Sequence, residues 1–218
     1  MNIHQFFEDP RVYGLTQKLN PFSVSLMTSL VVEHVRARDG EAVLDIGSGL
    51  GTRRKLFPAA SFTGIDNNPA YIEYASRVWG SGFRVMDAGR LEFPDASFDH
   101  AMSIAVCHHL DDATLTSMVR EALRVVRTGG ALHIIDPVLP VSRHAFVKRL
   151  VFESDRGRHQ RTLTQMAELL AAIAHIAGVD LRRGLLHDVC YFRLSSPVRN
   201  RHAAVGLTDS GIPSRVAD

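Results

Sequence analysis

The sequence predicts an α/β protein: a doubly wound, mostly parallel sheet of seven strands with helical additions at its N-terminus. Short apolar runs alternate along the chain with amphipathic stretches of helical length, which is typical of a parallel sheet covered by helices on both faces. The first apolar run, Val43–Ile46, opens directly into the glycine-rich turn Gly47–Gly51. Ligands of such sheets bind outside the carboxyl ends of the strands, so we expect the functional site there.

The N-terminal residues 1–38 are predicted to be helical and to cap the functional site. Pro21 separates two amphipathic stretches, and the second covers about residues 23–36. Residues 39–196 form the predicted core. Residues 197–218 are polar and glycine-containing, and we expect them to be a flexible tail.

Seven short apolar runs bounded by turn residues are the predicted strands. They are Ala42–Ile46, Ser61–Ile65, Phe83–Met86, Asp99–Ile104, Ala131–Ile135, Val179–Arg183 and Val189–Leu194. The sequence Thr128-Gly129-Gly130 predicts a turn before the fifth strand, and Asp136-Pro137 is predicted to end that strand.

The predicted helices of the core lie between these strands. A short helix or turn covers Gly51–Phe57 and stops before Pro58. A longer helix starts near Pro69, because proline is favoured in the first turn, and runs to Trp79. Acids at a helix N-terminus predict the next helix, from Asp111 and Asp112 through Val126. The last predicted helix covers Thr164–His175.

Length and composition indicate one globular domain with additions. The chain has 218 residues, 45% hydrophobic and 22% charged, with a net charge of +2. This charge does not indicate a nucleic-acid binder, which usually has a concentrated basic stripe. Cys107 and Cys190 lie far apart and predict reduced thiols. No apolar run reaches membrane-spanning length and the first ten residues lack a signal core, so we expect a soluble cytoplasmic protein.

The glycine turn is the most informative stretch, and Asp45 decides its interpretation. Glycine has no Cβ, so a ligand can lie directly against the backbone. The dinucleotide-binding pattern requires a sixth-position glycine, where this chain has Thr52. A carboxylate beside the turn would repel a pyrophosphate and would suit an amine or a sulfonium. The alternative is a tight strand-to-helix turn without a ligand.

Acids also follow later strands. Asp66, after the second strand, could accept hydrogen bonds from both hydroxyls of a ribose. Asp87, after the third, could accept from an exocyclic amine such as that of adenine. Asp136 follows the fifth. Acids favour turns in general, but an ordered series after successive strands fits a binding site better.

Three segments together carry a family resemblance. The pattern D-x-G-x-G-x-G at residues 45–51 resembles motif I of the class I S-adenosylmethionine-dependent methyltransferases. The segment Phe98–Leu110, which ends in H-H-L, is similar to their fourth-strand region. Leu123–Leu132 is similar to their L-R-V-L-x-P-G-G-x-L segment, with Thr128 in place of the usual proline. The resemblance covers about residues 40–137 and implies a Rossmann-like fold that uses S-adenosylmethionine and yields S-adenosylhomocysteine.

The resemblance also implies the cofactor-binding residues. Asp45 and the glycines would face the methionine part, Asp66 the ribose, Asp87 the adenine amine, and the Ser103 backbone the methionine amine and reacting methyl. The full predicted set is Asp45, Gly47, Ser48, Gly49, Asp66, Asn67, Asp87, Ala88, Ser103 and Ile104. Only fourteen residues lie between Gly51 and Asp66, so the helix after motif I is shorter than usual. We expect binding to be retained because it depends mainly on the amides of the turn.

The acceptor side is less specified. His108 and His109 are candidate general bases because histidine titrates near neutral pH; alternatively, the pair caps the next helix or packs under the cofactor. The basic segment 138–161 suggests an anionic small molecule, because arginine binds carboxylate or phosphate bidentately, although a charge run is usually a solvated face. The candidate substrate-binding residues are Tyr13, Arg156, Arg158 and His159. We expect no metal site.

The predicted function is methyl transfer to a small-molecule acceptor in secondary or lipid metabolism. One rival is an RNA or DNA methyltransferase, but the N/D-P-P-Y/F motif of amino-directed enzymes is replaced by Ser103–Val106, and no added RNA-binding module is visible. A second rival is a non-methylating protein of the same fold. A third, an NAD-dependent oxidoreductase, is disfavoured by Asp45 and Thr52.

Overall fold

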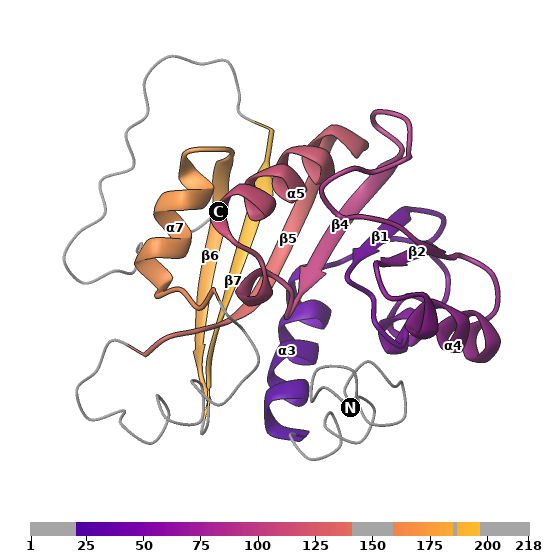
Figure 1. The fold of residues 1–218 in the computed structure, drawn as a ribbon, viewed down its shortest axis with the longest axis horizontal. Helices are drawn as coiled ribbons and strands as arrows, with labels where there is room; N and C mark the ends of the chain where they lie inside the picture. Colours follow the sequence, from indigo (N-terminus) through magenta and orange to yellow (C-terminus); the bar gives the residue numbers. More distant parts are fainter. Residues whose placement is uncertain (1–20, 141–158, 185–186, 197–218) are drawn as a thin grey trace, which may run out of the picture.

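A seven-stranded sheet forms the centre of the computed structural model, which describes residues 21–140, 159–184 and 187–196 (Figure 1). The strand order is β3-β2-β1-β4-β5-β7-β6. The strands β1 to β5 run parallel to one another, whereas β7 is antiparallel to both β5 and β6. The predicted fold class is confirmed. Residues 1–20 and 197–218, which contain the first predicted N-terminal helix and the predicted tail, lie outside the described residues.

The bounds of most elements agree with the sequence within two residues. The strands are β1 (Ala42–Ile46), β2 (Ser61–Asp66), β3 (Phe83–Val85), β4 (Phe98–Ile104), β5 (Val126–Val138), β6 (His175–Arg183) and β7 (Asp188–Ser195). The α-helices are α3 (Pro21–His34), α4 (Pro69–Trp79), α5 (Asp112–Val125) and α7 (Leu163–Ala171), and the short 3₁₀ helices are η1 (Thr52–Leu56) and η2 (Cys107–His109).

Helices cover both faces of the sheet, and each face has its own apolar core. Side chains alternate between the two faces along a strand, so neighbours such as Val43 and Leu44 enter different cores. Leu44, Ile134 and Phe192 pack with α5 and α7, whereas Val43 and Ile135 pack with α3 and α4. The sheet is therefore buried on both sides, and its strand ends are the places open to a ligand.

Side-chain caps begin three of the helices. Asn68 accepts a hydrogen bond from the amide of Ala70 at the start of α4, with Pro69 in the first turn. Asp111 accepts from the Thr114 amide at the start of α5. At α7, Thr162 and Gln165 form a reciprocal capping box. The cap of α4 follows the end of β2 closely, whereas the cap of α5 follows β4 only after the short helix η2 (Cys107–His109).

The predicted turn at Thr128–Gly130 is wrong, because these residues lie inside β5. The pairing of β4 with β5 shifts from Phe98–Val126 to His100–Ala131, so residues 127–130 bulge between the two pairs. The strand also continues past the predicted end, through Pro137 to Val138, because β7 pairs with it that far.

The last predicted helix is too long. It begins at Leu163 and ends at Ala171, and His175, the last residue of the predicted helix, is the first residue of β6. His175 pairs with Ser195 of β7, so a contact between distant parts of the chain overrides the local helical pattern.

Polar contacts fix α3 against the sheet. The His34 ring stacks on Tyr191 at 4.0 Å between centroids, and His34 Nε2 lies 3.3 Å from an Asp180 carboxylate oxygen. Tyr191 is hydrogen-bonded to His133, whose other ring nitrogen is 3.2 Å from His100. Burial lowers the pKa of His133 to about 3, so this ring is neutral at physiological pH. The sequence did not single out this chain of buried polar groups.

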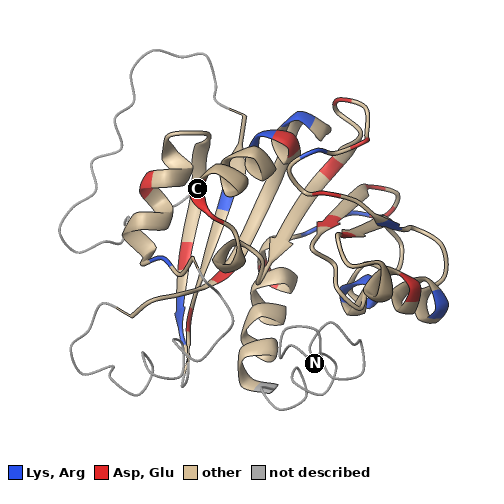
Figure 2. Ribbon diagram, in the orientation of Figure 1, with Lys and Arg blue, Asp and Glu red and all other residues tan. Residues whose placement is uncertain are grey.

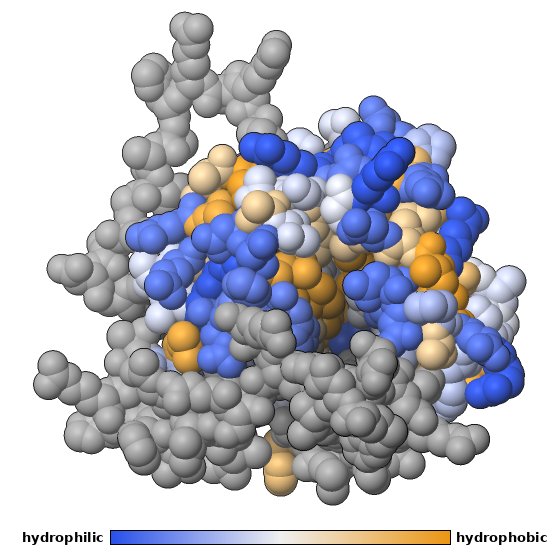
Figure 3. Space-filling model, viewed as in Figure 1, coloured by the Kyte–Doolittle hydropathy of each residue, from blue (hydrophilic) through white to orange (hydrophobic). Residues whose placement is uncertain are grey.

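The visible surface of the described residues is largely polar (Figure 3). Figure 3 shows that polar side chains cover most of the described surface on one face, with apolar residues in several separate patches between them. Within the described ranges, no helix combines the length and the apolar character needed to cross a bilayer.

Candidate functional site

The carboxyl ends of β3, β2, β1 and β4 lie next to one another in this order (Figure 1). The sheet therefore brings together the acids that the sequence placed at separate strand ends. Asp66 ends β2, Asp45 is the penultimate residue of β1, and Asp87 is the second residue after the end of β3. Ser103 and Ile104 end β4 on the other side of β1.

The glycine turn lies tightly against the loop after β4. Gly47 has a φ of 72°, and a Cβ there would overlap the side chain of Val106. The amides of Gly47 and Ser48 donate to the Ile65 carbonyl at 2.9 and 2.8 Å, and the Gly49 amide donates to Asp66 at 2.9 Å. The role of the turn amides in ligand binding stays a prediction, and these three amides are already engaged in hydrogen bonds within the fold. Their internal hydrogen bonds also remove the cradle that a pyrophosphate would need.

Asp45 is a buried carboxylate without a hydrogen bond. It is 0% exposed, and neither carboxylate oxygen has a hydrogen-bond partner among the described residues. Burial raises the pKa of Asp45 to about 6, and the nearby Arg53 guanidinium opposes that shift. The Ser48 hydroxyl is also buried without a partner in the same part of the chain. Because unsatisfied buried polar atoms are rare and costly, these two groups fit a cationic, hydrogen-bond-donating ligand.

Asp66 fixes the turn and retains acceptor capacity. One oxygen accepts from the Gly49 amide and the other from the Asn68 amide, both at 2.9 Å. Burial raises the pKa of Asp66, and these amides counteract part of the shift. A carboxylate accepts up to about four hydrogen bonds, so Asp66 can also accept from two ribose hydroxyls. Asn67 is exposed next to it.

The predicted adenine-side residues lie in the loop after β3. Asp87 is exposed, and one of its carboxylate oxygens accepts from the Gly89 amide at 2.8 Å. Ala88 is half-buried and packs against the core under α5. An exposed carboxylate fixed by one backbone amide can accept a further hydrogen bond from an amine.

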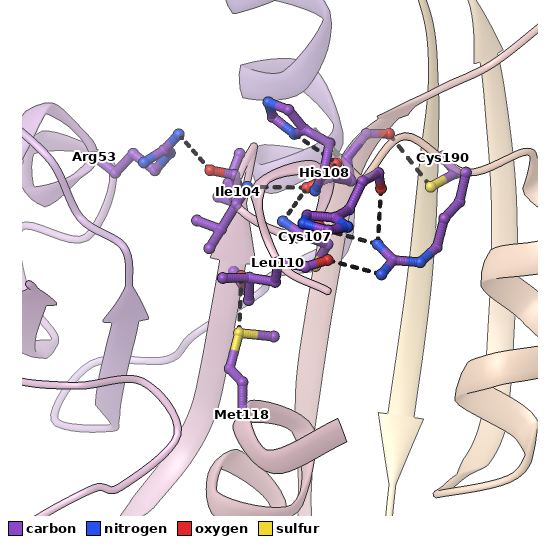
Figure 4. Close-up of polar contacts among 12 residues, drawn as sticks. Arg53, Ile104, Cys107, His108, Leu110, Met118 and Cys190 are labelled. Atoms are coloured by element: carbon purple, nitrogen blue, oxygen red, sulfur yellow. Dashed lines mark hydrogen bonds and ion pairs between the residues drawn. The ribbon is translucent and has the colours of Figure 1, made fainter. Parts of the chain in front are cut away.

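Ser103 and Ile104 offer backbone rather than side chains. Ser103 is fully buried, and its hydroxyl lies 3.7 Å from the Met118 sulfur on the α5 face (Figure 4). Ile104 is also buried, and its carbonyl accepts a hydrogen bond from Arg53 at 3.3 Å. The predicted role for the backbone at this strand end is compatible with this geometry.

Asp136 differs from the other acids, and grouping it with the strand-end series was wrong. It is 0% exposed and lies within β5. Its oxygens accept from the amides of Val106, Cys107 and His108 at 2.8–3.2 Å and contact His108 Nδ1 at 2.8 Å (Figure 4). Ala105, at the start of this loop, has a strained φ of 57°. Asp136 therefore fixes the loop after β4 and orients the His108 ring.

Arg161 holds the same loop from the other side. It is buried and donates to the carbonyls of Cys107 and Leu110 at 2.9 and 2.7 Å (Figure 4). It also pairs with Asp112 at 2.6 Å. Sequence reasoning counted Arg161 within the basic segment for an anion, but its guanidinium is engaged in these internal contacts. A sequence signal for this role is absent, because the partners lie about fifty residues away.

The two candidate bases have different surroundings. His108 is buried and bonded to Asp136, whereas His109 is exposed, with ring centroids 4.0 Å apart. The His159 amide donates to the His108 carbonyl at 3.0 Å, so the structure brings a predicted substrate residue next to a predicted base. His159 is exposed. Tyr13, Arg156 and Arg158 lie outside the described residues.

A cavity of about 480 Å³ lies beside this loop, at the start of α7. Its lining is polar and carries both signs of charge: Asp112, His159, Gln160, Arg161, Gln165, Glu168 and Leu169. His159 is the predicted substrate-binding residue that the structure places at a cavity.

In the described ranges, one cluster of side chains consists of residue types that can bind a metal ion. Ligand atoms of Glu33, His34 and Asp180 lie within 4.8 Å of one another. Arg182 pairs with both carboxylates at 2.8 Å, so its guanidinium already neutralises charge there. This cluster ties α3 to β6 and lies apart from the glycine turn.

A sheet in this order, with a glycine turn after β1 and acids at the ends of β1 and β2, defines a class of cofactor-binding α/β proteins. Residues 44–134 match a family model described as a methyltransferase domain. This match indicates a methyltransferase domain in these residues, and the pattern at residues 45–51 resembles motif I of the class I S-adenosylmethionine-dependent methyltransferases.

Relatives and solved structures agree with this assignment. The chain is 29% identical over 224 residues to 27-O-demethylrifamycin SV methyltransferase of Amycolatopsis mediterranei, covering 97% of this chain and 78% of that protein. It is 34% identical over 104 residues to 2-methyl-6-phytyl-1,4-hydroquinone methyltransferase of a Synechocystis strain, covering 44% of this chain and only 32% of that protein.

Two structures share the fold at low identity. An S-adenosylmethionine-dependent methyltransferase of Methanosarcina mazei has a TM-score of 0.63 at 20% identity and covers 76% of this chain and 97% of its own. The [4+2]-cyclase SpnF has a TM-score of 0.61 at 18% identity and covers 80% and 81%. The fold alone therefore does not specify the reaction.

Proposed function

We propose that this chain transfers a methyl group from S-adenosylmethionine to a small-molecule acceptor. The observation that carries this proposal is Asp45, a buried carboxylate without a hydrogen bond beside a glycine turn. A ligand with a cationic amino-acid end would satisfy it, and Asp66 on the next strand end would accept from the ribose of the same ligand. Asp87 and Ala88 would border the adenine, and the Ser103 and Ile104 backbone the methionine end.

The chemistry places few demands on the protein. When bound, S-adenosylmethionine supplies a methyl group that its sulfonium has already activated, and S-adenosylhomocysteine remains. The chain must therefore orient the acceptor in line with that methyl and exclude water. The loop after β4 would supply one wall for this purpose, because Asp136 accepts from its amides and Arg161 donates to its carbonyls.

Of the two candidate bases, we propose His108. Its Nδ1 lies 2.8 Å from Asp136, and a carboxylate at that position orients the ring and stabilises a protonated imidazole. His109, in contrast, is exposed. A proton leaving a hydroxyl acceptor would then move to His108.

This assignment is testable by comparing His108→Gln with His109→Ala. If His108 is the base, its variant loses about a hundredfold in kcat, and the fall of the wild-type rate on the acid side of the pH profile is lost. His109→Ala stays within about threefold. Equal rates for both variants, with a loss of thermal stability in His108→Gln alone, would assign His108 a packing role instead.

An anionic acceptor is the second part of the proposal. Support comes from the position of His159 beside the His108 carbonyl and at the polar cavity. Arg156 and Arg158 precede it in sequence, and Tyr13 is proposed to cover the same side. Changing Arg156 and Arg158 to alanine should weaken acceptor binding and spare S-adenosylhomocysteine binding; unchanged acceptor affinity would contradict the anionic assignment.

The acceptor's metabolic setting is also a proposal. The two relatives described above act, by their names, on 27-O-demethylrifamycin SV and on 2-methyl-6-phytyl-1,4-hydroquinone. Both are small molecules, which supports secondary or lipid metabolism. Cys107 and Cys190 are both free and buried, which agrees with the expected cytoplasmic setting.

The nucleic-acid alternative has less support. Figure 2 shows acidic and basic residues interspersed over the part of the chain that the structure describes. An extended basic stripe would instead favour nucleic-acid binding. A filter-binding measurement with tRNA and duplex DNA, at low and physiological salt, tests this point.

Calorimetric titration with S-adenosylmethionine, S-adenosylhomocysteine and NAD tests the proposed cofactor. Binding of NAD alone would contradict the proposal. A screen of candidate acceptors with labelled methyl donor, read by mass spectrometry, then tests transfer. Tight cofactor binding with no transfer to any acceptor class would favour a non-methylating role, such as the cyclase activity named for the structural neighbour.

A further inference from the structure

Arg53 enters the strand-end region from the shortened segment after the glycine turn. The segment is the 3₁₀ helix η1, and Arg53 is its second residue. One guanidinium nitrogen lies 3.8 Å from an Asp45 oxygen, and the other donates to the Ile104 carbonyl at 3.3 Å. Figure 4 shows the Arg53 side chain directed at the end of β4. The guanidinium therefore spans the ends of β1 and β4.

The contact with Asp45 is an ion pair without a hydrogen bond. At 3.8 Å the guanidinium reduces the cost of the buried charge but leaves both Asp45 oxygens unsatisfied. Arg53 is largely buried, with a side chain 19% exposed. A largely buried cation beside a carboxylate that it does not satisfy fits a site where a second donor completes the arrangement.

The neighbouring basic residues are directed elsewhere. Arg54 donates to the Phe57 carbonyl and lies over the Phe62 ring, 5.8 Å from its centroid. Lys55 is exposed. In this run of three basic residues, Arg53 is the one whose described contacts reach the strand ends.

We propose that Arg53 recognises the amino-acid end of the cofactor. Without ligand, its guanidinium lies between Asp45 and the Ile104 carbonyl. When the cofactor binds, the ligand's ammonium contacts these two acceptors and Arg53 pairs with the ligand's carboxylate. This inference rests on the proposed function. The charges balance. Asp45 is negative and faces the ligand's ammonium, and Arg53 is positive and faces the ligand's carboxylate. Arginine suits the role because its planar fork binds a carboxylate through two parallel hydrogen bonds.

Short η1 gives this role a structural basis. The segment after the turn is a 3₁₀ helix of five residues, Thr52–Leu56, which is more tightly wound than an α-helix with 3.6 residues per turn. The segment that looked like a departure from the family pattern thus places a charged side chain next to Asp45.

The test compares ligands that differ only at the amino-acid end. S-adenosylhomocysteine carries the ammonium and carboxylate, whereas 5′-methylthioadenosine lacks both and keeps the adenosine and thioether. Calorimetry measures both dissociation constants for the full-length wild type and for Arg53→Ala, Arg53→Gln, Arg53→Lys and Lys55→Ala. Far-UV circular dichroism and thermal melts establish that each variant is folded, and Arg53→Gln replaces Arg53→Ala if the latter is not.

Arg53→Ala and Arg53→Gln should weaken S-adenosylhomocysteine binding by about tenfold to a hundredfold, the range for a charge-assisted hydrogen-bonded pair. Binding of 5′-methylthioadenosine should change by less than about twofold. Arg53→Lys should recover part of the loss, because it keeps the charge without the fork. Lys55→Ala should change neither constant.

Other outcomes overturn the inference. Equal weakening of both ligands would mean that Arg53 supports the fold of the site, and unchanged or tighter S-adenosylhomocysteine binding would mean that Arg53 makes no favourable contact with the ligand. If wild type binds S-adenosylmethionine and S-adenosylhomocysteine, the proposed cofactor stands whatever Arg53 does. If wild type binds neither, the proposed function fails first.

Discussion

Two buried aspartates flank the fourth strand, one on each side, and they have opposite surroundings. Asp45 on β1 and Asp136 on β5 are both 0% exposed, and both strands pair with β4. Both Asp45 oxygens lack hydrogen-bond partners in the described part of the chain. Asp136 accepts from three backbone amides and contacts the His108 ring.

The difference separates a group held for a ligand from a group that holds the fold. A buried carboxylate whose acceptors are filled by amides stabilises the loop that those amides belong to. A buried carboxylate without donors costs free energy in the ligand-free protein and gains when a donor arrives. The same residue type near a strand end can therefore serve either purpose, and its hydrogen-bond partners decide which.

The largest expected effect on stability comes from removing Asp136, the buried carboxylate whose oxygens accept hydrogen bonds. Asp136→Ala leaves three amides and the His108 ring without their acceptor in a buried loop, so the free energy of unfolding should fall by about 4 kcal/mol. Urea denaturation measures this. Asp39→Ala, which removes an exposed acid, should change it by less than about 0.5 kcal/mol. Similar losses for the two variants would contradict the structural role of Asp136.

The pH dependence of the free energy of unfolding tests Asp45, the buried carboxylate without hydrogen bonds. Burial raises the pKa of Asp45 from 3.8 to about 6, so the folded state holds this proton more tightly than the unfolded state between these values. The Asp45 contribution is most favourable below about pH 4 and is lost as pH rises through 6, a loss on the order of 3 kcal/mol. Relative to wild type, Asp45→Asn should therefore gain stability between pH 4 and pH 7. Denaturation curves whose difference stays constant with pH would exclude this.

The same variant sharpens the comparison through binding. Asp45→Asn removes the charge that the ligand's ammonium would meet, so the dissociation constant for S-adenosylhomocysteine should rise about a hundredfold, or about 2.7 kcal/mol. Its melting temperature at pH 7 should be unchanged or higher. Calorimetry and thermal melts give both readouts. A variant that melts lower and still binds tightly would place Asp45 in the same structural role as Asp136.

The smallest expected effect concerns Ser48. Its hydroxyl is buried without a partner among the described residues, so Ser48→Ala removes an unsatisfied group with little loss of packing. The free energy of unfolding should rise or stay level, within about 1 kcal/mol. A clear loss of stability would show that the hydroxyl has a partner in the ligand-free protein.

Local patterns predicted the parallel half of the molecule well. β1 was predicted to the residue, and α4 matches because Pro69 and Asn68 mark its start by chemistry that acts over one turn. The row of acids at the strand ends follows from the parallel topology, because parallel strands bring their carboxyl ends to one edge.

Long-range contacts decided what the sequence missed. The early end of α7 and the full length of β6 depend on pairing with β7, and the bulge in β5 depends on its register with β4. The roles of Asp136 and Arg161 depend on backbone groups of a loop about thirty and fifty residues away in sequence. No periodicity or local spacing encodes such partners.

By itself the sequence determined the fold class, the edge of the sheet that carries the site, and the chemical character of the turn Asp45–Gly51. These features depend on short-range rules: alternation, glycine conformation, and the charge of one residue beside a turn. Only the tertiary structure decided which buried acid lacks hydrogen-bond donors and which is saturated, and that Arg53 lies against Asp45. The physical reason is that hydrogen-bond satisfaction is a property of three-dimensional neighbours, which strand pairing and loop packing alone bring together.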